Sequence, residues 1–265
     1  MKAQMKAMIL AAGLGTRLRP LTDDRPKALV ELAGHTLLEI ALRRLQSVGV
    51  TSVIVNTHHF ADQVAAYLAA HNHFDMHVEI SREDTLLDTG GGLQKAAPFF
   101  LADGSDQPFL LHNVDVLSTI DLRRMVQFHT EHNALATLAV QNRPTSRSLL
   151  FDQHGQLCGR RRGQDAPPEY ASPAPVHSAE TRAFSGIHVL SPRIFSLLTE
   201  QAPFSIISAY LRLAAQGQSI LAFPADGAYW RDLGRPESIA QAAQDLRNED
   251  LRNGQYPTLN TLDQS

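Results

Sequence analysis

The sequence has little cysteine and no long apolar run, and each scarcity excludes a class of protein. Its single cysteine, Cys158, has no partner for an intrachain disulfide, which fits a reducing compartment. No apolar stretch approaches the roughly 20 residues that a membrane-spanning helix needs. Residues 1–4 show no signal-peptide pattern and lead directly into a predicted core strand. We therefore expect a soluble cytoplasmic protein with no membrane partner.

The chain also lacks an excess of either charge. It has 24 Lys and Arg against 27 Asp and Glu, for a formal net charge of -3. A general nucleic-acid binder would carry a basic face, so nucleic acid is not expected as a partner. The exception is local, because basic residues gather at Arg17, Arg19, Arg25 and Lys27. A basic cluster inside a mildly acidic chain predicts a binding site for an anion.

This basic stretch follows an apolar run, Met8 to Ala12, that is typical of a buried strand. The run ends at Gly13 and Gly15, which can take positive φ and let a ligand approach the backbone. Thr16 and Arg17 then add a hydroxyl group and a positive charge. Backbone N–H groups converge at such a turn and bind phosphate well. The stretch therefore predicts a loop that holds a nucleoside triphosphate.

Two better-known phosphate loops do not match this stretch. A Walker A loop requires Gly-Lys-Ser/Thr after the glycines, and none follows here. The dinucleotide fingerprint requires a third glycine where this chain has Leu18. A bare Gly-x-Gly is also a common structural turn, so the prediction depends on the whole string from Ala12 to Lys27.

Strand and helix patterns alternate along the chain and predict an α/β fold with a doubly wound, mostly parallel sheet. The 265 residues, 43% of them hydrophobic, are enough for one large domain with a lobe. The expected strands are 8–12, 52–56, 77–81, 109–112, 135–140, 184–190 and 220–224. The expected helices are 37–48, 60–70, 122–132, 192–198, 206–215 and 236–246. Residues 148–152 and 157 are expected to form a hairpin around Gly155.

A second glycine-rich segment, Asp88 to Gly92, lies between a predicted strand and a short helix that reaches Ala97. Three consecutive glycines are costly in conformational entropy and usually mark a backbone that must bend or admit a neighbour. Ligands of open α/β sheets bind at the carboxyl ends of strands, where this loop is expected. We interpret the segment as a ligand-contacting loop, and a plain helix-entry loop is the alternative.

Two aspartates, Asp115 and Asp232, follow short apolar segments that are far apart in sequence. A Mg²⁺ ion that carries a triphosphate is typically held by one or two carboxylates together with phosphate oxygens. Two carboxylates on one rim of the sheet would meet that need. Spacing alone leaves the alternative that both are turn or cap residues. Trp230 is expected to pack beside Asp232.

Residues 159–182 differ from the rest because they are rich in arginine and proline and show little periodicity. This composition predicts a long surface loop or mobile flap. Its arginines, Arg160 to Arg162, are interpreted as solvated, with closure over a substrate phosphate as the alternative. Residues 248–265 are expected to form a polar tail.

Taken together, the motifs resemble the sugar-1-phosphate nucleotidylyltransferase family over nearly the full length of the chain. The motifs that carry the resemblance are 12–27, 88–92, 113–115, 184–186 and 230–234. The resemblance implies a Rossmann-like, GT-A-type nucleotidyltransferase fold with a small sugar-binding lobe. It divides a single domain, 1–247, into a mainly nucleotide-binding part, 1–140, and a mainly sugar-phosphate-binding part, 141–247.

The resemblance also implies roles for matching residues. Those implied to bind the nucleotide are Ala12, Gly13, Gly15, Thr16, Arg17, Thr89, Gly90, Gly91 and Asn113. Those implied to border the sugar phosphate are Lys27, Asp115 and Gly186. Asp115 and Asp232 are the implied Mg²⁺ ligands, and Arg17, Lys27 and Asp115 are the implied catalytic residues. The match departs at Val114, where the family commonly has glycine, which could alter the approach of the backbone to the nucleotide ribose.

The implied reaction is direct displacement, in which the phosphate of a sugar 1-phosphate attacks the α-phosphorus of a triphosphate and pyrophosphate leaves. The chain looks most like N-acetylmuramate-1-phosphate uridylyltransferases, followed by mannose- or heptose-1-phosphate guanylyltransferases, so UTP or GTP is the expected nucleotide. A non-catalytic nucleotide-sugar-binding regulatory protein is the alternative of another class. The resemblance is compatible with a monomer or a homodimer.

Overall fold

A computed structural model describes residues 5–163, 165–172 and 178–247 of the chain. The predicted tail, 248–265, lies outside this range. The first half of the chain contains β1 (Lys6–Leu10), η1 (Thr16–Leu18), η2 (Lys27–Leu29), β2 (Glu31–Leu32), β3 (His35–Thr36), α1 (Leu37–Ser47), β4 (Ser52–Thr57), α2 (Ala61–Ala70), η3 (Asn72–Asp75), β5 (His77–Arg82), α3 (Asp88–Lys95), α4 (Ala97–Leu101), β6 (Phe109–Asn113), β7 (Val116–Ser118) and α5 (Leu122–Glu131). The second half contains β8 (Ala136–Gln141), β9 (Arg147–Phe151), β10 (Leu157–Arg162), β11 (Glu169–Tyr170), β12 (Glu180–Leu190), α6 (Ile194–Leu197), α7 (Ile206–Ala215), β13 (Ile220–Pro224), β14 (Trp230–Asp232) and α8 (Pro236–Asp245).

The first half builds a parallel sheet in the order β6-β1-β4-β5. The register places Met8 of β1 between Ile54 of β4 and Leu111 of β6. Strands β1, β4 and β6 are buried on both faces, which explains their nearly continuous apolar sequences. Because the strands are parallel, their carboxyl ends meet at one edge of the sheet, and the predicted phosphate loop leaves β1 at that edge.

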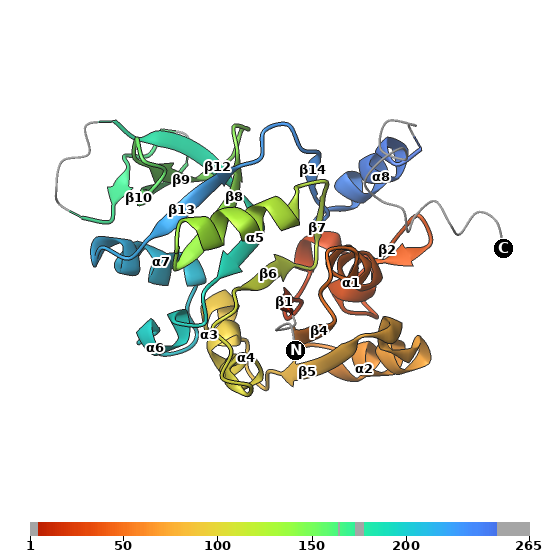
Figure 1. Cartoon of the computed structure of the whole chain (residues 1–265). Coiled ribbons are helices and arrows are strands. Elements are labelled where there is room, and N and C mark those ends of the chain that lie inside the picture. The colour runs from red at the N-terminus through yellow and green to blue at the C-terminus, as the bar shows by residue number, and fades with distance from the viewer. Residues whose placement is uncertain (1–4, 164, 173–177, 248–265) are drawn as a thin grey trace.

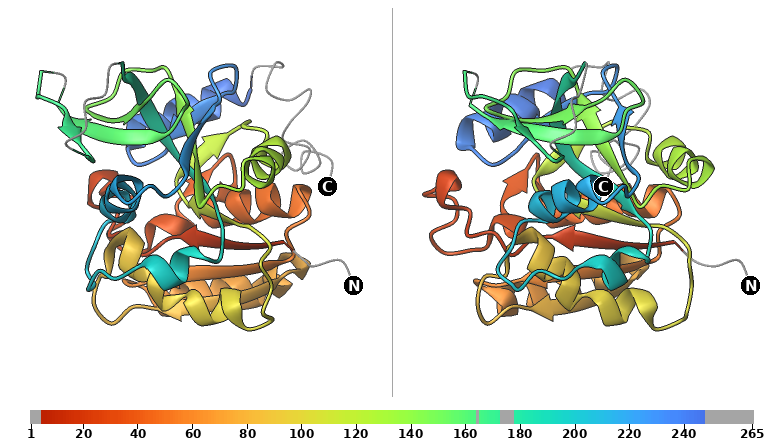
Figure 2. Two further views of the ribbon diagram at one scale, coloured as in Figure 1. Left: turned by 60° about the vertical axis from the view of Figure 1, so that its left-hand side comes forward. Right: turned by 90° about the vertical axis from the view of Figure 1, so that its left-hand side faces the viewer.

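The second half extends the same sheet with antiparallel strands around the long strand β12 (Figures 1 and 2). Residues Ile187–Leu190 of β12 pair with β6, and residues Glu180–Ala183 pair with β9. The register on β8 shifts between Phe184 and His188, where Gly186 has a φ of 75°. A residue with a side chain adopts such a φ with strain, so glycine suits this bend. The hairpin of β9 and β10 turns at Gly155, as expected.

Helices cover both faces of the sheet and close two separate apolar cores (Figure 1). Helices α1, α2, α5 and α8 contribute to one core, and α3, α4, α6 and α7 contribute to the other. Strand residues alternate between the cores, so that Ala7 and Ile9 face the first and Met8 faces the second. The predicted α/β, doubly wound fold is confirmed, with parallel strands in the first half and mainly antiparallel pairing in the second.

Two local predictions are wrong. Residues Asp88 to Gly92 form the start of helix α3 and not a loop. Residues 159–182 were expected to be irregular, but β10 continues through Arg162, β11 occupies Glu169–Tyr170, and β12 begins at Glu180. Pairing with β9 supplies the regularity that the sequence pattern lacks. Residues 164 and 173–177 of this segment are outside the described range.

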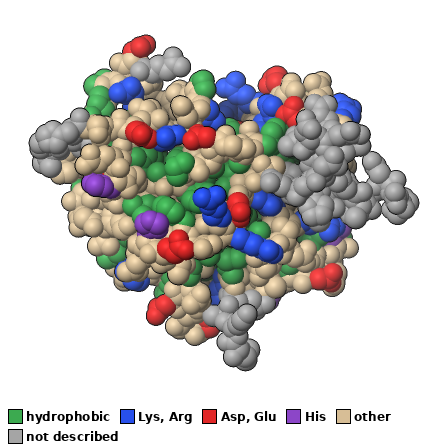
Figure 3. All heavy atoms as spheres, turned by 45° about the horizontal axis from the view of Figure 1, so that its top comes forward, with side chains coloured by type: hydrophobic (Ala, Val, Ile, Leu, Met, Phe, Trp, Pro, Cys, Tyr) green, Lys and Arg blue, Asp and Glu red, His purple; other side chains and the backbone are tan. Residues whose placement is uncertain are grey.

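The described ranges contain no helix that is both long and apolar enough to cross a bilayer. Figure 3 shows basic and acidic side chains interspersed over one face of the molecule, with apolar side chains between them. This mixture of charges agrees with the nearly balanced composition.

Candidate active site

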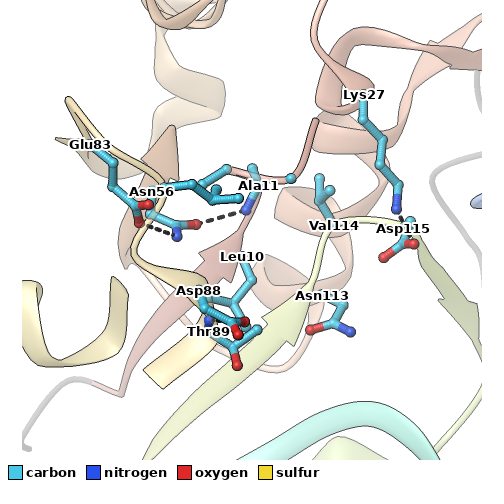
Figure 4. A pocket seen from close by; sticks show the side chains of 13 residues that line it. Leu10, Ala11, Lys27, Asn56, Glu83, Asp88, Thr89, Asn113, Val114 and Asp115 are labelled. Atoms are coloured by element: carbon cyan, nitrogen blue, oxygen red, sulfur yellow. Dashed lines mark hydrogen bonds and ion pairs between the residues drawn. The ribbon is translucent and has the colours of Figure 1, made fainter. Parts of the chain in front are cut away.

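A pocket of about 260 Å³ opens where the carboxyl ends of β1, β4 and β6 meet, next to the start of α3 (Figure 4). We call it the small pocket. It is lined by Leu10, Ala11, Ala12, Gly13, Lys27, Asn56, Glu83, Leu86, Asp88, Thr89, Asn113, Val114 and Asp115. Its position follows from the topology, because ligands of parallel α/β sheets bind at this edge.

One wall of the small pocket is held by a buried hydrogen-bond network (Figure 4). The N–H of Ala11 donates to Oδ1 of Asn56 at 2.8 Å, and Nδ2 of Asn56 donates to Oε1 of Glu83 at 2.8 Å. The other carboxylate oxygen of Glu83 accepts the N–H of Leu87 at 3.0 Å. Buried polar groups that are satisfied in this way fix the geometry of their surroundings. The network therefore ties the phosphate loop to the segment before α3.

The turn after β1 presents backbone donors. Among the described residues, the N–H groups of Ala12, Gly13 and Leu14 have no backbone or side-chain acceptor. Gly15 has a φ of 65°, and a Cβ added there would lie 3.2 Å from Cβ of Lys27. The turn therefore packs closely against the residue that carries the nearest cation. Free N–H groups beside a cation suit an anionic ligand.

Lys27 and Asp115 form an ion pair at the mouth of the small pocket (Figure 4). Their side chains are 14% and 12% exposed, so the pair is largely shielded from water. Antiparallel pairing of β7 with β14 places Asp232 opposite Val116, and the N–H of Leu233 donates to the carbonyl oxygen of Asp115 at 2.8 Å. Asp115, in the turn just before β7, and Asp232, at the end of β14, are therefore close in space although they are distant in sequence.

The turn after β14 brings a second cation to the same region. Oδ1 of Asp232 accepts the N–H of Gly234 at 2.7 Å. A Cβ added at Gly234 would lie 2.7 Å from a terminal guanidinium nitrogen of Arg17. Glycine therefore leaves the space that the Arg17 guanidinium occupies beside the aspartate. Arg17 is otherwise exposed, as is Thr16, and neither lines the small pocket.

The residues present suit a Mg²⁺ ion that arrives with a nucleotide. Asp115 and Asp232 supply two carboxylates, and Oδ2 of Asp232 has no partner among the described residues. The described part of the chain contains no group of three His, Cys, Asp or Glu that could hold a metal by itself. Mg²⁺ is commonly bound by one or two carboxylates with phosphates and waters completing its shell. This donor set fits a metal whose remaining ligands come from a substrate.

A larger cavity of about 860 Å³ continues from the small pocket and shares Asp88, Thr89 and Asn113 with it. We call it the large cavity. It lies against the second half of the chain, with Gly186 and Asp232 in its wall. A Cβ at Gly186 would lie 2.9 Å from Nδ2 of Asn113, so the glycine allows β12 to approach this side chain closely. Two adjoining spaces could hold the two halves of a bipartite ligand.

The glycines of α3 are placed differently from the expectation of a ligand-contacting loop. Gly90 and Gly91 are buried inside the helix, and neither lines the small pocket. A Cβ on Gly90 would collide with the ring of Phe204, and one on Gly91 would lie 2.8 Å from Cβ of Ala202. Both glycines therefore allow close packing. Thr89 does line both spaces, and its hydroxyl oxygen accepts the N–H of Ile206 at 3.0 Å.

Sequence reasoning missed Arg143, which lines the large cavity. Its guanidinium stacks on Trp230 with 3.5 Å between Cζ and the ring centroid, and Nη2 donates to the carbonyl oxygen of Phe184 at 2.7 Å. Burial lowers the pKa of Arg143, and the nearby carboxylate of Asp232 acts in the opposite direction. Trp230 was expected only to pack beside Asp232. A lone arginine after a strand carries no sequence signal for this arrangement.

Asn56 and Glu83 were also missed as pocket residues. Each follows or ends a strand that was predicted, and both are buried, at 3% and 4% exposure. A polar residue at the carboxyl end of a buried strand was the available signal. Val114, the departure from the family pattern, is in the pocket wall, and its N–H donates to the carbonyl oxygen of Leu10 at 3.1 Å.

Three known proteins illustrate what this chain resembles. It is 33% identical over 241 residues to N-acetylmuramate alpha-1-phosphate uridylyltransferase of Caulobacter vibrioides, and the alignment covers 88% of this chain and 93% of that protein. It is 30% identical over 239 residues to mannose-1-phosphate guanylyltransferase 1 of Arabidopsis thaliana, and this alignment covers 88% of this chain and 62% of that protein. The structure of HddC from Yersinia pseudotuberculosis complexed with GMP-PN has a TM-score of 0.71 at 22% identity, over 92% of this chain and 100% of that chain. The model of the family described as nucleotidyl transferase matches residues 6–149.

Proposed function

Because the chain belongs to the nucleotidyl transferase family and is a sugar-1-phosphate nucleotidyltransferase, we propose that it transfers uridine monophosphate from UTP to N-acetylmuramate 1-phosphate and releases pyrophosphate. The observation that carries the proposed site is the convergence of Lys27, Asp115 and Asp232 beside a turn with free N–H groups. These groups match a reaction between two phosphates, which needs charge neutralisation and alignment more than a strong base.

The proposed division of labour follows the two spaces. The small pocket takes the nucleotide, with the turn from Ala12 to Gly15 against its base and phosphates. The large cavity takes the sugar, with Gly186 and Asn113 at the boundary. Residues 1–140 then contribute mainly to nucleotide binding and residues 141–247 mainly to sugar binding. The reacting phosphates meet where the two spaces join.

Lys27 and Arg17 are the proposed catalytic cations. In the free protein Lys27 is paired with Asp115, so its ammonium group is already held at the mouth of the small pocket. With substrates bound, it neutralises the α-phosphate and the incoming sugar phosphate. Arg17, held beside Gly234, stabilises charge on the β- and γ-phosphates as pyrophosphate leaves.

Asp115 and Asp232 are the proposed ligands of Mg²⁺. A Mg²⁺ ion held by these two carboxylates would supply positive charge that offsets the repulsion between the phosphate groups. The ion pair with Lys27 holds Asp115 in place, and the hydrogen bond from Gly234 orients Asp232. Each carboxylate is therefore fixed by its own protein partner before any ligand arrives.

We choose uridine and N-acetylmuramate because the chain matches the uridylyltransferase over a larger share of that relative's length. This chain covers 93% of the uridylyltransferase from Caulobacter vibrioides but 62% of the guanylyltransferase from Arabidopsis thaliana. Mannose or heptose 1-phosphate with GTP is the second candidate, and the identity to the plant enzyme supports it. Both candidate reactions use the same phosphate chemistry. They differ in the base and the sugar, which the walls of the two spaces would have to distinguish.

A pyrophosphate-release assay tests the proposal. UTP, GTP, CTP and ATP are each combined with N-acetylmuramate, mannose, heptose and glucose 1-phosphates in the presence of Mg²⁺. The highest kcat/KM is expected for UTP with N-acetylmuramate 1-phosphate. A maximum for GTP with mannose or heptose 1-phosphate would select the second candidate. Nucleotide-sugar binding without pyrophosphate release from any pair would indicate a regulatory protein.

A further inference from the structure

Arginine side chains dominate the charge of the large cavity. Five line it, namely Arg143, Arg147, Arg160, Arg161 and Arg162. The carboxylates in its wall are Asp88 and Asp232, and the second of these is a proposed metal ligand. The phosphate of a sugar 1-phosphate is expected at the other end, near Lys27. The arginines therefore exceed what one phosphate and the cavity's own carboxylates neutralise.

Three of the five arginines have a structural partner. Nε of Arg160 lies 2.7 Å from Oε2 of Glu169, and Nε of Arg162 lies 3.7 Å from Oε1 of the same residue. Together they lower the pKa of the Glu169 carboxyl group. Arg143 is fixed by Trp230 and by a backbone carbonyl. Each of these guanidinium groups thus has a partner within the protein, although Nε of Arg143 has none among the described residues.

The remaining two, Arg147 and Arg161, are different. Within the described ranges, no carboxylate lies within 4.0 Å of either guanidinium group, and neither side chain donates a hydrogen bond. Arg147 is exposed, whereas Nε of Arg161 is buried and has no partner within the described residues. A buried donor without an acceptor is destabilising, so such groups usually have a functional explanation.

The strand register concentrates this charge. Arg162 of β10 is directly opposite Arg147 of β9, and Arg161 is opposite Ser148. Like charges opposite each other on paired strands are unfavourable. The hairpin therefore concentrates positive charge on one part of the cavity wall.

We propose that Arg147 and Arg161 bind a carboxylate carried by the sugar, so that the enzyme selects an acidic sugar 1-phosphate over a neutral one. A guanidinium group matches a carboxylate through two parallel N–H donors and is the usual side chain for this recognition. The inference rests on the proposed function, and it names residues that determine the specificity of the sugar site. N-acetylmuramate has such a carboxylate on its lactyl ether, and N-acetylglucosamine lacks it.

The test compares uridylyl transfer to N-acetylmuramate 1-phosphate with transfer to N-acetylglucosamine 1-phosphate, which differ only in the lactyl group. The expected ratio of kcat/KM is about tenfold or more in favour of the acidic sugar, mainly through KM, because a charge-assisted pair is lost with the neutral one. In Arg161→Gln the ratio is expected to fall about tenfold. In Arg161→Lys, which keeps the charge, part of the preference should return.

Arg182→Gln is the matched control. Arg182 is on the neighbouring strand β12, is paired with Glu180 and Asp226, and does not line the cavity. Its variant should retain the wild-type ratio. Thermal melting of all variants shows whether each is folded.

Binding of the two sugar phosphates is also measured by calorimetry with UTP absent, so the preference can be read without turnover. Equal kcat/KM or equal affinity for the two sugars would overturn the inference, as would an unchanged ratio in Arg161→Gln. Absence of pyrophosphate release together with a preserved binding preference would contradict the proposed reaction and support the carboxylate site.

Discussion

The small pocket and the large cavity adjoin, but they differ in how completely their buried polar side chains are paired. In the small pocket the polar side chains satisfy one another, through the network of Asn56 and Glu83 and the pair of Lys27 with Asp115. In the wall of the large cavity, buried nitrogens of Arg143, Arg161 and His188 have no partner within the described residues. The protein alone preorganises the side chains of the first space, whereas the second retains buried nitrogens that a polar ligand would satisfy.

The largest expected effect tests the preorganised side. Lys27→Ala should lower kcat/KM for pyrophosphate release on the order of 10²-fold or more, because a fixed charge at the reacting phosphates is lost. Steady-state kinetics with both substrates measures the change. Arg25→Ala serves as the control, since Arg25 is exposed and forms an ion pair with the neighbouring Asp24. Unaltered turnover in Lys27→Ala would remove this residue from the proposed mechanism.

A substitution next to the buried network tests whether it fixes the small pocket. In Gly92→Ala the new Cβ would lie 2.8 Å from both Nδ2 of Asn56 and Oε1 of Glu83. We expect a loss of about 1–3 kcal/mol in the free energy of unfolding and a higher KM for the nucleotide. Gly227→Ala, which has no atom within 4 Å of its Cβ, should change stability by less than about 0.5 kcal/mol. Urea denaturation separates the two, and equal stabilities would contradict a tight network.

Acid should weaken the sheet behind the large cavity. Burial lowers the pKa of His112 to about 4 and that of His188 to about 3. In the unfolded state the pKa of a histidine is about 6.5, so between about pH 6.5 and the lower pKa of the folded state the unfolded chain binds more protons than the folded one. The contribution of each histidine to stability is therefore complete above about pH 6.5 and is lost as the pH falls. Each histidine should cost about 2 kcal/mol between pH 7 and pH 5.

The measurement for this prediction is the urea midpoint at the two pH values, in the wild type and in His188→Gln. Glutamine can still bond to the hydroxyl of Tyr210, which lies 2.9 Å from Nδ1 of His188, but it does not titrate. The variant should therefore show a smaller loss on acidification. An equal loss in both proteins would show that His188 is not the source.

The smallest effect concerns the wall that positions Arg143. Trp230→Phe removes the indole N–H that donates to the carbonyl oxygen of Ser185 at 2.8 Å and leaves a weaker surface for the guanidinium. We expect a loss of about 1 kcal/mol in stability and a rise of about two- to fivefold in KM for the sugar 1-phosphate. The KM for the nucleotide should stay within error. A change confined to the KM for the nucleotide would contradict the proposal that the large cavity binds the sugar and the small pocket binds the nucleotide.

The elements that sequence predicted well are those with local signals. Helix α1 has apolar residues at helical spacing and a cap at Thr36, whose hydroxyl accepts the N–H of Glu39 at 3.1 Å. Helix α7 was predicted with its observed bounds. Helix α3 was not, because glycine disfavours helices and only the tertiary neighbours Phe204 and Ala202 explain why no larger residue fits.

The candidate site was predictable to the extent that it lies in one continuous motif. The turn after β1 and the position of Asp115 at a strand end follow from the pattern of the sequence. That Asp232 lies beside Asp115 depends on pairing between two three-residue strands, which no periodicity indicates. The positions of Arg143 and Arg161 in one cavity likewise could not be predicted, because they depend on how β8, β9 and β10 assemble into a common wall.

The pairing of β7 with β14 also has a consequence for protein synthesis. During translation Asp115 is synthesised long before Asp232. Among the described elements only helix α8 follows β14, the strand that contains Asp232. The parallel strands β1, β4, β5 and β6 and the glycine turn are therefore all synthesised before the second of the two carboxylates. The proposed metal site would form only after β14 has been synthesised and has paired with β7, so a nascent chain that stops before β14 would lack one of its two proposed ligands.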